Sequence, residues 1–247
     1  MSLRIAHLYP QTMSTYGDLG NITCLVRRCE WRNIAVTVIP IEIGEEIPAD
    51  IDLYFFGGGQ DVAQTSVGND LIGKKGQRIL NDARAGVPIL AICGGYQLLG
   101  SSYQPAEGPQ IPGLGLFPVT TVAGSKRLIG DLVLTADPRL SLGEEHPTIV
   151  GFENHSGNTS SIDVSIDFPL GTVRHGGGNN GSDGTEGCCV YSSIGCYLHG
   201  SLLPKNPHLA DWLIQKALTH KGIDQPLAKL DDTMEWEAHQ AIVGRYM

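Results

Sequence analysis

The segment Ile89-Leu90-Ala91-Ile92-Cys93-Gly94-Gly95-Tyr96-Gln97 determines how we interpret this sequence. Its first four residues are apolar, which is typical of a buried strand in a parallel sheet. The two glycines after Cys93 permit a sharp turn into a helix, so the cysteine projects from the carboxyl end of the strand in the geometry of a nucleophile elbow. A buried structural thiol is the alternative for Cys93, and the flanking glycines favour the nucleophile.

Around this segment, short apolar runs alternate with stretches of helical spacing. This alternation predicts βαβ units, a mostly parallel sheet and helices on its faces. Short β-like runs in the second half predict strands that extend or flank that sheet, and a last helix is expected within residues 222–247. The expected strands are 3–9, 35–39, 53–56, 88–93, 117–120, 131–135, 148–152, 188–192 and 195–198, and the other helices are 21–32, 70–85 and 207–218.

Composition narrows the class of protein. The 247 residues are 41% hydrophobic and 17% charged, with a net charge of −9, which predicts a globular chain that binds no nucleic acid. The longest apolar run, residues 88–93, is far shorter than the roughly 20 residues that span a bilayer. No secretory signal is recognised, and six cysteines in a chain of this size are expected to stay reduced in the cytoplasm. We therefore expect one α/β domain over residues 1–247, located in the cytoplasm and not inserted in a membrane.

A second glycine cluster, Gly57-Gly58-Gly59, follows the expected strand 53–56. The carboxyl ends of parallel strands meet at one edge of a sheet, so this cluster is expected beside Cys93. A helix N-terminus favours the thiolate form of a cysteine, and backbone N–H groups there stabilise an oxyanion. The sequence thus predicts backbone donors at Gly94 and at Gly58 or Gly59.

A thiolate nucleophile needs a base, and among eight histidines His199 is favoured because a short apolar run precedes it and Gly200 follows. His155 and His175 remain candidates for lining the site. No metal site is predicted: Cys188 and Cys189 are adjacent, so in a strand they point to opposite faces, and no C-x-x-C pair exists. The glycine-rich residues 175–187 are expected to form a loop bordering the substrate site or a partner.

Several of these segments resemble class I glutamine amidotransferases of the cobyric acid synthase type and, more closely, the GatD-type glutaminase subunits of lipid II isoglutaminyl synthases. The resemblance runs over about residues 5–218. The segments are Ala91-Ile92-Cys93-Gly94-Gly95-Tyr96-Gln97, Tyr197-Leu198-His199-Gly200, His7-Leu8-Tyr9-Pro10, Tyr16-Gly17-Asp18-Leu19-Gly20-Asn21, 55–61, Gly151-Phe152-Glu153-Asn154-His155, Gly178-Asn179-Asn180, Asp183-Gly184-Thr185-Glu186-Gly187 and 198–207.

The resemblance implies a flavodoxin-like three-layer fold and hydrolysis of L-glutamine, with Cys93 as nucleophile, His199 as base and Arg127 as the ligand of the substrate. A guanidinium suits an α-carboxylate because it forms paired hydrogen bonds. It also implies a heterodimer with a Mur-ligase-like partner, MurT, that uses ATP and Mg to amidate the D-glutamate of membrane-bound lipid II. No cofactor is expected in this chain.

One departure concerns the acidic residue that orients the histidine. Classical members of the class follow this histidine with proline and glutamate, whereas Gly200 and Ser201 follow His199 here. We therefore expect a catalytic dyad or a carboxylate from the partner, with Glu153 a weaker internal candidate, and low activity for the isolated chain. Two alternatives stay open: an amidotransferase for a cobyrinate-type acceptor, although 247 residues leave no room for its usual synthetase domain, and a non-catalytic scaffold.

Overall fold

A mostly parallel sheet carries the predicted site residues at one edge. The computed structural model describes residues 1–13, 17–143, 145–163, 165, 168–200 and 202–247, and of Asp61 and Val62 the backbone only. Its sheet has the order β11-β12-β4-β3-β1-β2, in which only β11 runs antiparallel to its neighbour. The strands are β1 (Ser2–Leu8), β2 (Ala35–Ile41), β3 (Leu53–Phe56), β4 (Ile89–Ile92), β11 (Cys188–Val190) and β12 (Ser193–Cys196).

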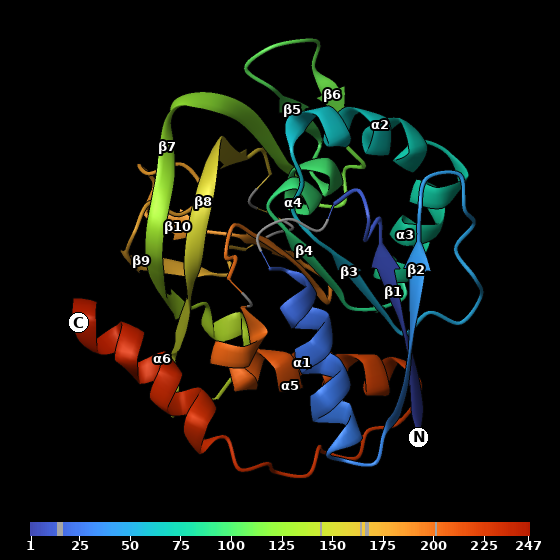
Figure 1. The fold of residues 1–247 in the computed structure, drawn as a ribbon, viewed down its shortest axis with the longest axis vertical. Coiled ribbons are helices and arrows are strands. Elements are labelled where there is room, and N and C mark those ends of the chain that lie inside the picture. Colours follow the sequence, from blue (N-terminus) through green and yellow to red (C-terminus); the bar gives the residue numbers. More distant parts are fainter. Residues whose placement is uncertain (14–16, 144, 164, 166–167, 201) are drawn as a thin grey trace.

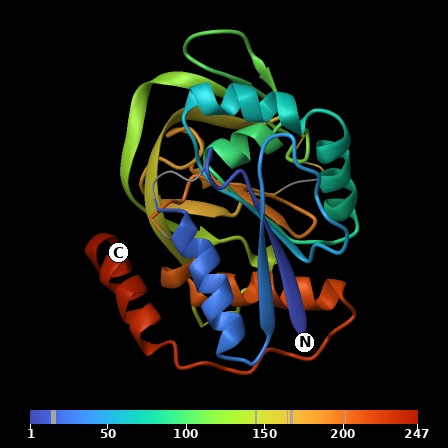
Figure 2. The same cartoon turned by 45° about the vertical axis from the view of Figure 1, so that its right-hand side comes forward.

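Helices form the two outer layers (Figures 1 and 2). Helix α1 (Leu19–Glu30) packs with α5 (Pro207–His220), and α2 (Asp61–Leu71) packs with α3 (Lys74–Arg84) and α4 (Gly94–Leu99). The chain crosses from β1 to β2 in one direction along the sheet and from β3 to β4 in the other, so right-handed crossovers place these two groups of helices on opposite faces. The predicted α/β sandwich is confirmed.

The single helix predicted over residues 70–85 is wrong. The chain forms α2 and α3 instead, which are separated at Ile72 and Gly73. Gly73 has a φ of 107°, a conformation that glycine adopts at little cost and that cannot continue an α-helix. The apolar spacing alone did not reveal this break.

The other six strands that the structure describes form a second sheet. Its order is β10-β9-β7-β5-β6, with β8 paired to β7. The predicted strands 117–120 and 131–135 mark the two ends of one long strand, because the middle of β7 is polar and exposed. The register between β7 and β8 shifts between Ala123 and Leu128. The strands are β5 (Ser102–Gln104), β6 (Ile111–Pro112), β7 (Val119–Ala136), β8 (Thr148–Ser161), β9 (Gly171–His175) and β10 (Thr185–Glu186).

The tail ends in helix α6 (Thr233–Tyr246), which contacts β7, β8 and the short helix η2 (Leu203–Lys205). A second short helix, η1, spans Pro138–Leu140. Trp236 of α6 stacks on His146 and Tyr246 stacks on His175, with ring centroids 3.6 Å apart in both pairs. The tail therefore packs against the second sheet. No helix in the described part of the chain has both the length and the apolar content that a bilayer crossing requires.

Candidate active site

Cys93 lies at a strained turn between β4 and α4. Its φ of 50° and ψ of −105° are unusual for a residue with a side chain. A Cβ atom on Gly94 would lie 2.8 Å from Cε of Met13, and one on Gly95 would lie 2.7 Å from the carbonyl oxygen of Phe56. The lack of a side chain at Gly94 and Gly95 therefore lets the start of α4 lie close to Phe56 and Gly59, while the unusual backbone angle of the turn is at Cys93 itself.

His199 is held next to Cys93 by the neighbouring strand. Cys196, at the end of β12, pairs with Ile92 of β4, and the N–H of Cys93 donates to the carbonyl of Cys196 at 2.8 Å. The N–H of His199 donates to the carbonyl of Phe152 on β8 at 2.8 Å, so the histidine backbone is fixed from the second sheet. This places the imidazole near Cys93: a Cβ atom on Gly58 would lie 2.8 Å from Cε1 of His199 and 3.3 Å from Cβ of Cys93.

Asp18, immediately before α1, is fully buried and supplies a carboxylate to His199. Its Oδ1 lies 3.1 Å from Nδ1 of His199, and its Oδ2 accepts the N–H of Gly58 at 2.9 Å. Burial opposes protonation of the His199 imidazole. The contact with the Asp18 carboxylate and the influence of nearby Cys93 outweigh this and raise the pKa of His199 to about 10. The arrangement Cys93–His199–Asp18 favours a protonated imidazole next to the thiol.

The expectation of a dyad or a partner's carboxylate therefore does not match this site, since an internal carboxylate contacts His199. Glu153 is the wrong internal candidate: its carboxylate accepts the N–H groups of Gly177 and Gly178 at 2.7 and 2.9 Å. One feature of the sequence could have indicated Asp18. It lies in the loop between the first strand and the following helix, and such loops are at the sheet edge where functional groups gather. Tyr16 and Ser201, which took part in the sequence comparison, lie outside the described residues.

The predicted oxyanion donors separate into two groups. Gly58 does not fit, because its N–H donates to Asp18, although its lack of a side chain matters: a Cβ there would lie 2.8 Å from Cε1 of His199. Gly59 and Gly94 remain candidates, since the backbone nitrogen of Gly59 lies 3.0 Å from the Cβ position of Gly94. Neither N–H hydrogen bonds to another residue in the described ranges.

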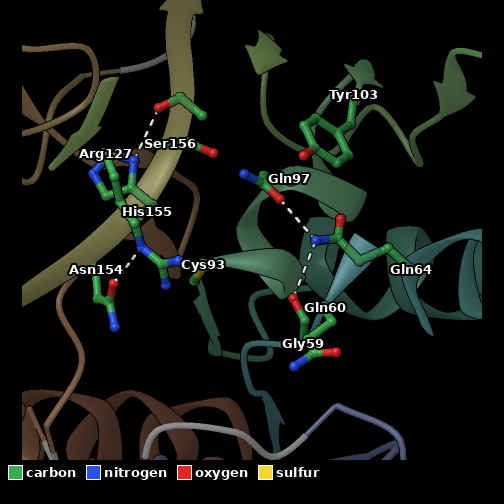
Figure 3. A pocket seen from close by; sticks show the side chains of 11 residues that line it. Gly59, Gln60, Gln64, Cys93, Gln97, Tyr103, Arg127, Asn154, His155 and Ser156 are labelled. Atoms are coloured by element: carbon green, nitrogen blue, oxygen red, sulfur yellow. Dashed lines mark hydrogen bonds between the residues drawn. The ribbon is translucent and has the colours of Figure 1, made fainter. Parts of the chain in front are cut away.

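A pocket of about 380 Å³ opens in front of Cys93 (Figure 3). Arg127 reaches it from the register shift in β7, and its Nε donates to Oδ1 of Asn154 on β8 at 2.8 Å. The structure thus brings Arg127 and Cys93 to one pocket, as the resemblance implied. The lining residues are Gly59, Gln60, Gln64, Cys93, Gln97, Tyr103, Arg127, Asn154, His155, Ser156 and Gly157.

The two remaining histidine candidates lie in different places. His155 lines the pocket, with its ring stacked 3.6 Å from that of Tyr197, whereas His175 stacks on Tyr246 of α6. The glycine-rich loop is anchored by Glu153, whose Oε2 lies 3.8 Å from Nε2 of His155, and it contributes no described residue to the lining of the Cys93 pocket. Among the described side chains, no three His, Cys, Asp or Glu residues form a group suited to a metal ion.

Solved structures place this architecture among glutamine amidotransferases. A glutamine amidotransferase from Thermotoga maritima is 15% identical, with a TM-score of 0.57 over 98% of this chain and 94% of its own. The glutaminase domain of Trypanosoma brucei CTPS, with bound acivicin, is 12% identical, with a TM-score of 0.54 over 88% and 94% of the two chains. At these identities the likeness shows the fold alone.

Residues 4–207 match the CobB/CobQ-like glutamine amidotransferase domain, and the chain belongs to that family. It is 39% identical to the GatD subunit of lipid II isoglutaminyl synthase (glutamine-hydrolyzing) from Staphylococcus aureus, over 98% of this chain and 96% of that protein. The corresponding subunit from Streptococcus pneumoniae is also 39% identical, over 95% and 88%. A cobyric acid synthase from Jannaschia is 33% identical over 82% of this chain but only 42% of its own length.

Proposed function

We propose that this chain is the glutamine-hydrolysing subunit of a lipid II isoglutaminyl synthase. The observation that carries the proposal is the buried arrangement of Cys93, His199 and Asp18, in which Cys93 lines a pocket that Arg127 also lines. The near full-length similarity to two GatD subunits supports the choice of complex. Membership of the glutamine amidotransferase family supports the choice of reaction.

The first half-reaction uses the charge distribution of this site. The Cys93 thiolate attacks the side-chain carboxamide carbon of glutamine, and the backbone N–H groups of Gly59 and Gly94 hold the resulting oxyanion. The protonated His199 gives its proton to the departing nitrogen, which leaves as ammonia while a glutamyl thioester forms on Cys93. Asp18 stabilises the imidazolium before this transfer and fixes the ring orientation.

The second half-reaction returns the site to its starting state. Neutral His199 accepts a proton from water, and the oxygen of that water attacks the thioester carbon. The carbon–sulfur bond breaks, which releases glutamate, the Cys93 thiolate and a protonated His199. Arg127 binds the α-carboxylate throughout, because its guanidinium supplies paired donors and Asn154 orients it.

The ammonia serves a partner in this proposal. A Mur-ligase-like subunit, MurT, binds ATP and Mg, activates the α-carboxyl of D-glutamate in the lipid II stem peptide and forms D-isoglutamine. This chain itself needs no cofactor and forms a heterodimer with that ligase in the cytoplasm.

The proposal is tested first at Cys93. We expect Cys93→Ala to abolish ammonia release from L-glutamine and to prevent labelling by a glutamine-analogue electrophile, measured by intact mass. Cys24→Ala is the matched control: this half-buried thiol lies on α1 outside the pocket, so both activities should persist. Retained glutaminase activity in Cys93→Ala, or an inert wild-type chain both alone and with its ligase, would refute the proposal and favour a non-catalytic scaffold.

A cobyrinate-type acceptor is the second candidate, favoured by the similarity to cobyric acid synthases. The acceptor follows from the ligase that binds the chain. We expect a Mur-ligase-like protein to co-purify and to raise the glutaminase rate when added to the isolated chain. Co-purification with a cobyrinate-activating synthetase, without amidation of lipid II, would instead support the second candidate.

A further inference from the structure

The side chain of Met13 packs against both glycines whose N–H groups are the candidate oxyanion donors. Met13 is fully buried and is not among the described residues that line the Cys93 pocket. A Cβ atom on Gly59 would lie 2.1 Å from Sδ of Met13, and one on Gly94 would lie 2.8 Å from its Cε. A Cβ position is one bond from its α-carbon, so the thioether lies directly against the backbone of both glycines.

The backbone of Met13 also contacts the glycine segment 57–59. Its carbonyl oxygen would lie 2.6 Å from a Cβ atom on Gly57, whose own carbonyl accepts the N–H of Gly95 at 3.2 Å. At the other end of the segment, Nε2 of Gln64 donates to the carbonyl of Gly59 at 3.3 Å (Figure 3). The segment is thus enclosed by Met13, by the start of α4 and by α2. The separation of the two candidate N–H groups then depends on the side chain that fills the space beside them.

The turn that carries Met13 is fixed by its surroundings. The N–H of Met13 donates to the carbonyl of Tyr9 at 2.7 Å. Tyr9 is fully buried and has a φ of 52°, a strained conformation that persists only where neighbouring groups hold it. Its hydroxyl donates to Oδ2 of Asp70 on α2 at 2.7 Å, and Nζ of Lys75, which pairs with Asp70, lies 4.8 Å from the centroid of its ring. Met13 is therefore held in place from α2 and α3.

We propose that Met13 is a positioning residue that sets the separation of the N–H groups of Gly59 and Gly94 and thereby the stabilisation of the oxyanion. This rests on the proposed function, since it concerns the same reaction. The unbranched thioether is suited to this role because it is polarisable and fills irregular space between backbone segments. The oxyanion exists only after the Cys93 thiolate has attacked, so misplaced donors slow the reaction more than they weaken glutamine binding.

Truncation and replacement of Met13, in the complex with the ligase, test this assignment. We expect Met13→Ala to lower the single-turnover rate constant for ammonia release, per folded molecule, by about 10- to 100-fold, because small displacements of catalytic groups cost rates of this order. The dissociation constant of L-glutamine, measured by calorimetry in the Cys93→Ala background, should change by less than about threefold. Met13→Leu keeps nearly the same volume and should restore the rate to within about threefold of wild type.

Two further variants separate positioning from a general loss of packing. Ile79→Ala also truncates a fully buried side chain, on α3 and outside the described lining of the pocket. It should lower the thermal stability but leave the rate per folded molecule unchanged. Tyr9→Phe removes only the hydroxyl that holds the turn to Asp70 and leaves no large cavity. It should lower the rate by about 3- to 10-fold without weakening L-glutamine binding.

The outcomes distinguish this assignment from the proposed function. A rate within about threefold of wild type in folded Met13→Ala overturns the role of Met13, and so does an equal loss in Ile79→Ala or a loss of L-glutamine binding as large as the loss of rate. If Met13→Ala does not fold, an unchanged rate in Tyr9→Phe overturns it instead. A wild-type complex that releases no ammonia from L-glutamine refutes the proposed function itself, and the role of Met13 with it.

Discussion

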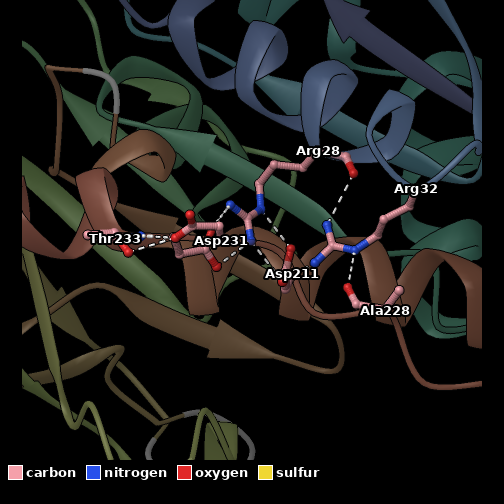
Figure 4. Close-up of polar contacts among 7 residues, drawn as sticks. Arg28, Arg32, Asp211, Ala228, Asp231 and Thr233 are labelled. Carbon is pink, nitrogen blue, oxygen red and sulfur yellow. Dashed lines mark hydrogen bonds and ion pairs between the residues drawn. The ribbon is translucent and has the colours of Figure 1, made fainter.

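Helix α1 carries buried charged side chains at both ends. At its N-terminal end, Asp18 contacts the titratable His199 and the N–H of Gly58. Near its C-terminal end, Arg28 forms paired hydrogen bonds with Asp211 of α5 and with Asp232 before α6, at 2.6 to 3.0 Å (Figure 4). The Asp18 carboxylate and the Arg28 guanidinium are both buried, yet their chemistry differs.

The difference lies in whether a proton can move. Arg32 also donates to Asp211, so two guanidinium groups contact two carboxylates. Burial opposes the charge of Arg28, but its hydrogen bonds to Asp211 and Asp232 outweigh this and raise its pKa far above the usual range. No proton leaves this cluster near neutral pH. At the other end a single carboxylate faces an imidazole that also contacts Cys93. One end of α1 is thus suited to joining three segments and the other to proton transfer.

The largest effect is expected when the charge at the reactive end is removed. Asp18→Asn keeps the shape of the side chain but no longer stabilises the imidazolium or fixes its tautomer, so kcat for ammonia release should fall by about 10³- to 10⁴-fold. The free energy of unfolding at pH 7 should also fall, because the carboxylate of Asp18 contributes to the raised pKa of His199 in the folded chain. Steady-state ammonia assays and urea denaturation measure the two quantities.

This variant also separates an internal acid from one supplied by a partner. The assay is therefore run on the isolated chain and on the complex with its ligase. If Asp18→Asn retains activity within about threefold of wild type in the complex, the catalytic carboxylate comes from elsewhere and Asp18 is structural.

At the Arg28 end of α1, the structural end, we expect a large loss of stability and little change in activity. Arg28→Met leaves two carboxylates without their main partner and should lower the free energy of unfolding by about 3 to 5 kcal/mol. Activity per folded molecule should stay near wild type. Arg27→Met is the matched control, because Arg27 is exposed and its ion pair with Glu30 is exposed as well, so a change below about 0.5 kcal/mol is expected. Equal losses in both variants would show that the Arg28 cluster contributes little.

The two ends of α1 also differ in how visible they are in the sequence. Cys93 and His199 each follow a short apolar run and precede glycine, so local patterns were sufficient to nominate them. Asp18 and His199 are 181 residues apart, and Arg28 and Asp211 are 183 apart. Their contacts exist only once the sheet brings the segments together, and a single sequence contains no spacing rule for them.

Fold elements were predicted where apolar runs were continuous and missed where polar residues interrupt them. Strands β3 and β4 are buried along their whole length, and their sequences are uniformly apolar. Strand β7 is 18 residues long but has a polar, exposed centre and a register shift that carries Arg127 to the pocket. Hydrophobic periodicity cannot detect a strand that buries only its ends. The resemblance, and not the periodicity, nominated Arg127, which lines the same pocket as Cys93.

The pH dependence of stability should differ between the two ends. The pKa of His199 is about 10 in the folded chain, against about 6.5 for an ordinary histidine. Its stabilising contribution is therefore complete below pH 6.5 and is lost as the pH rises towards 10, with a slope of up to about 1.4 kcal/mol per pH unit. Unfolding measured from pH 6.5 to 10 should show this slope in wild type and in Arg28→Met, and a smaller slope in Asp18→Asn. An unchanged slope in Asp18→Asn would contradict the pairing.

The smallest effect is expected when only one of the two carboxylates that contact Arg28 is removed. Asp232→Asn leaves Arg28 paired with Asp211 and should cost about 1 to 2 kcal/mol, less than Arg28→Met. Because α6 begins at Thr233, directly after Asp232, the loosened contact should raise amide hydrogen exchange in α6 and leave α1 unchanged. Glutaminase activity should also be unaffected. Faster exchange in α1 as well would mean that the cluster holds the helix itself, and the division between the reactive and structural ends would then be less complete.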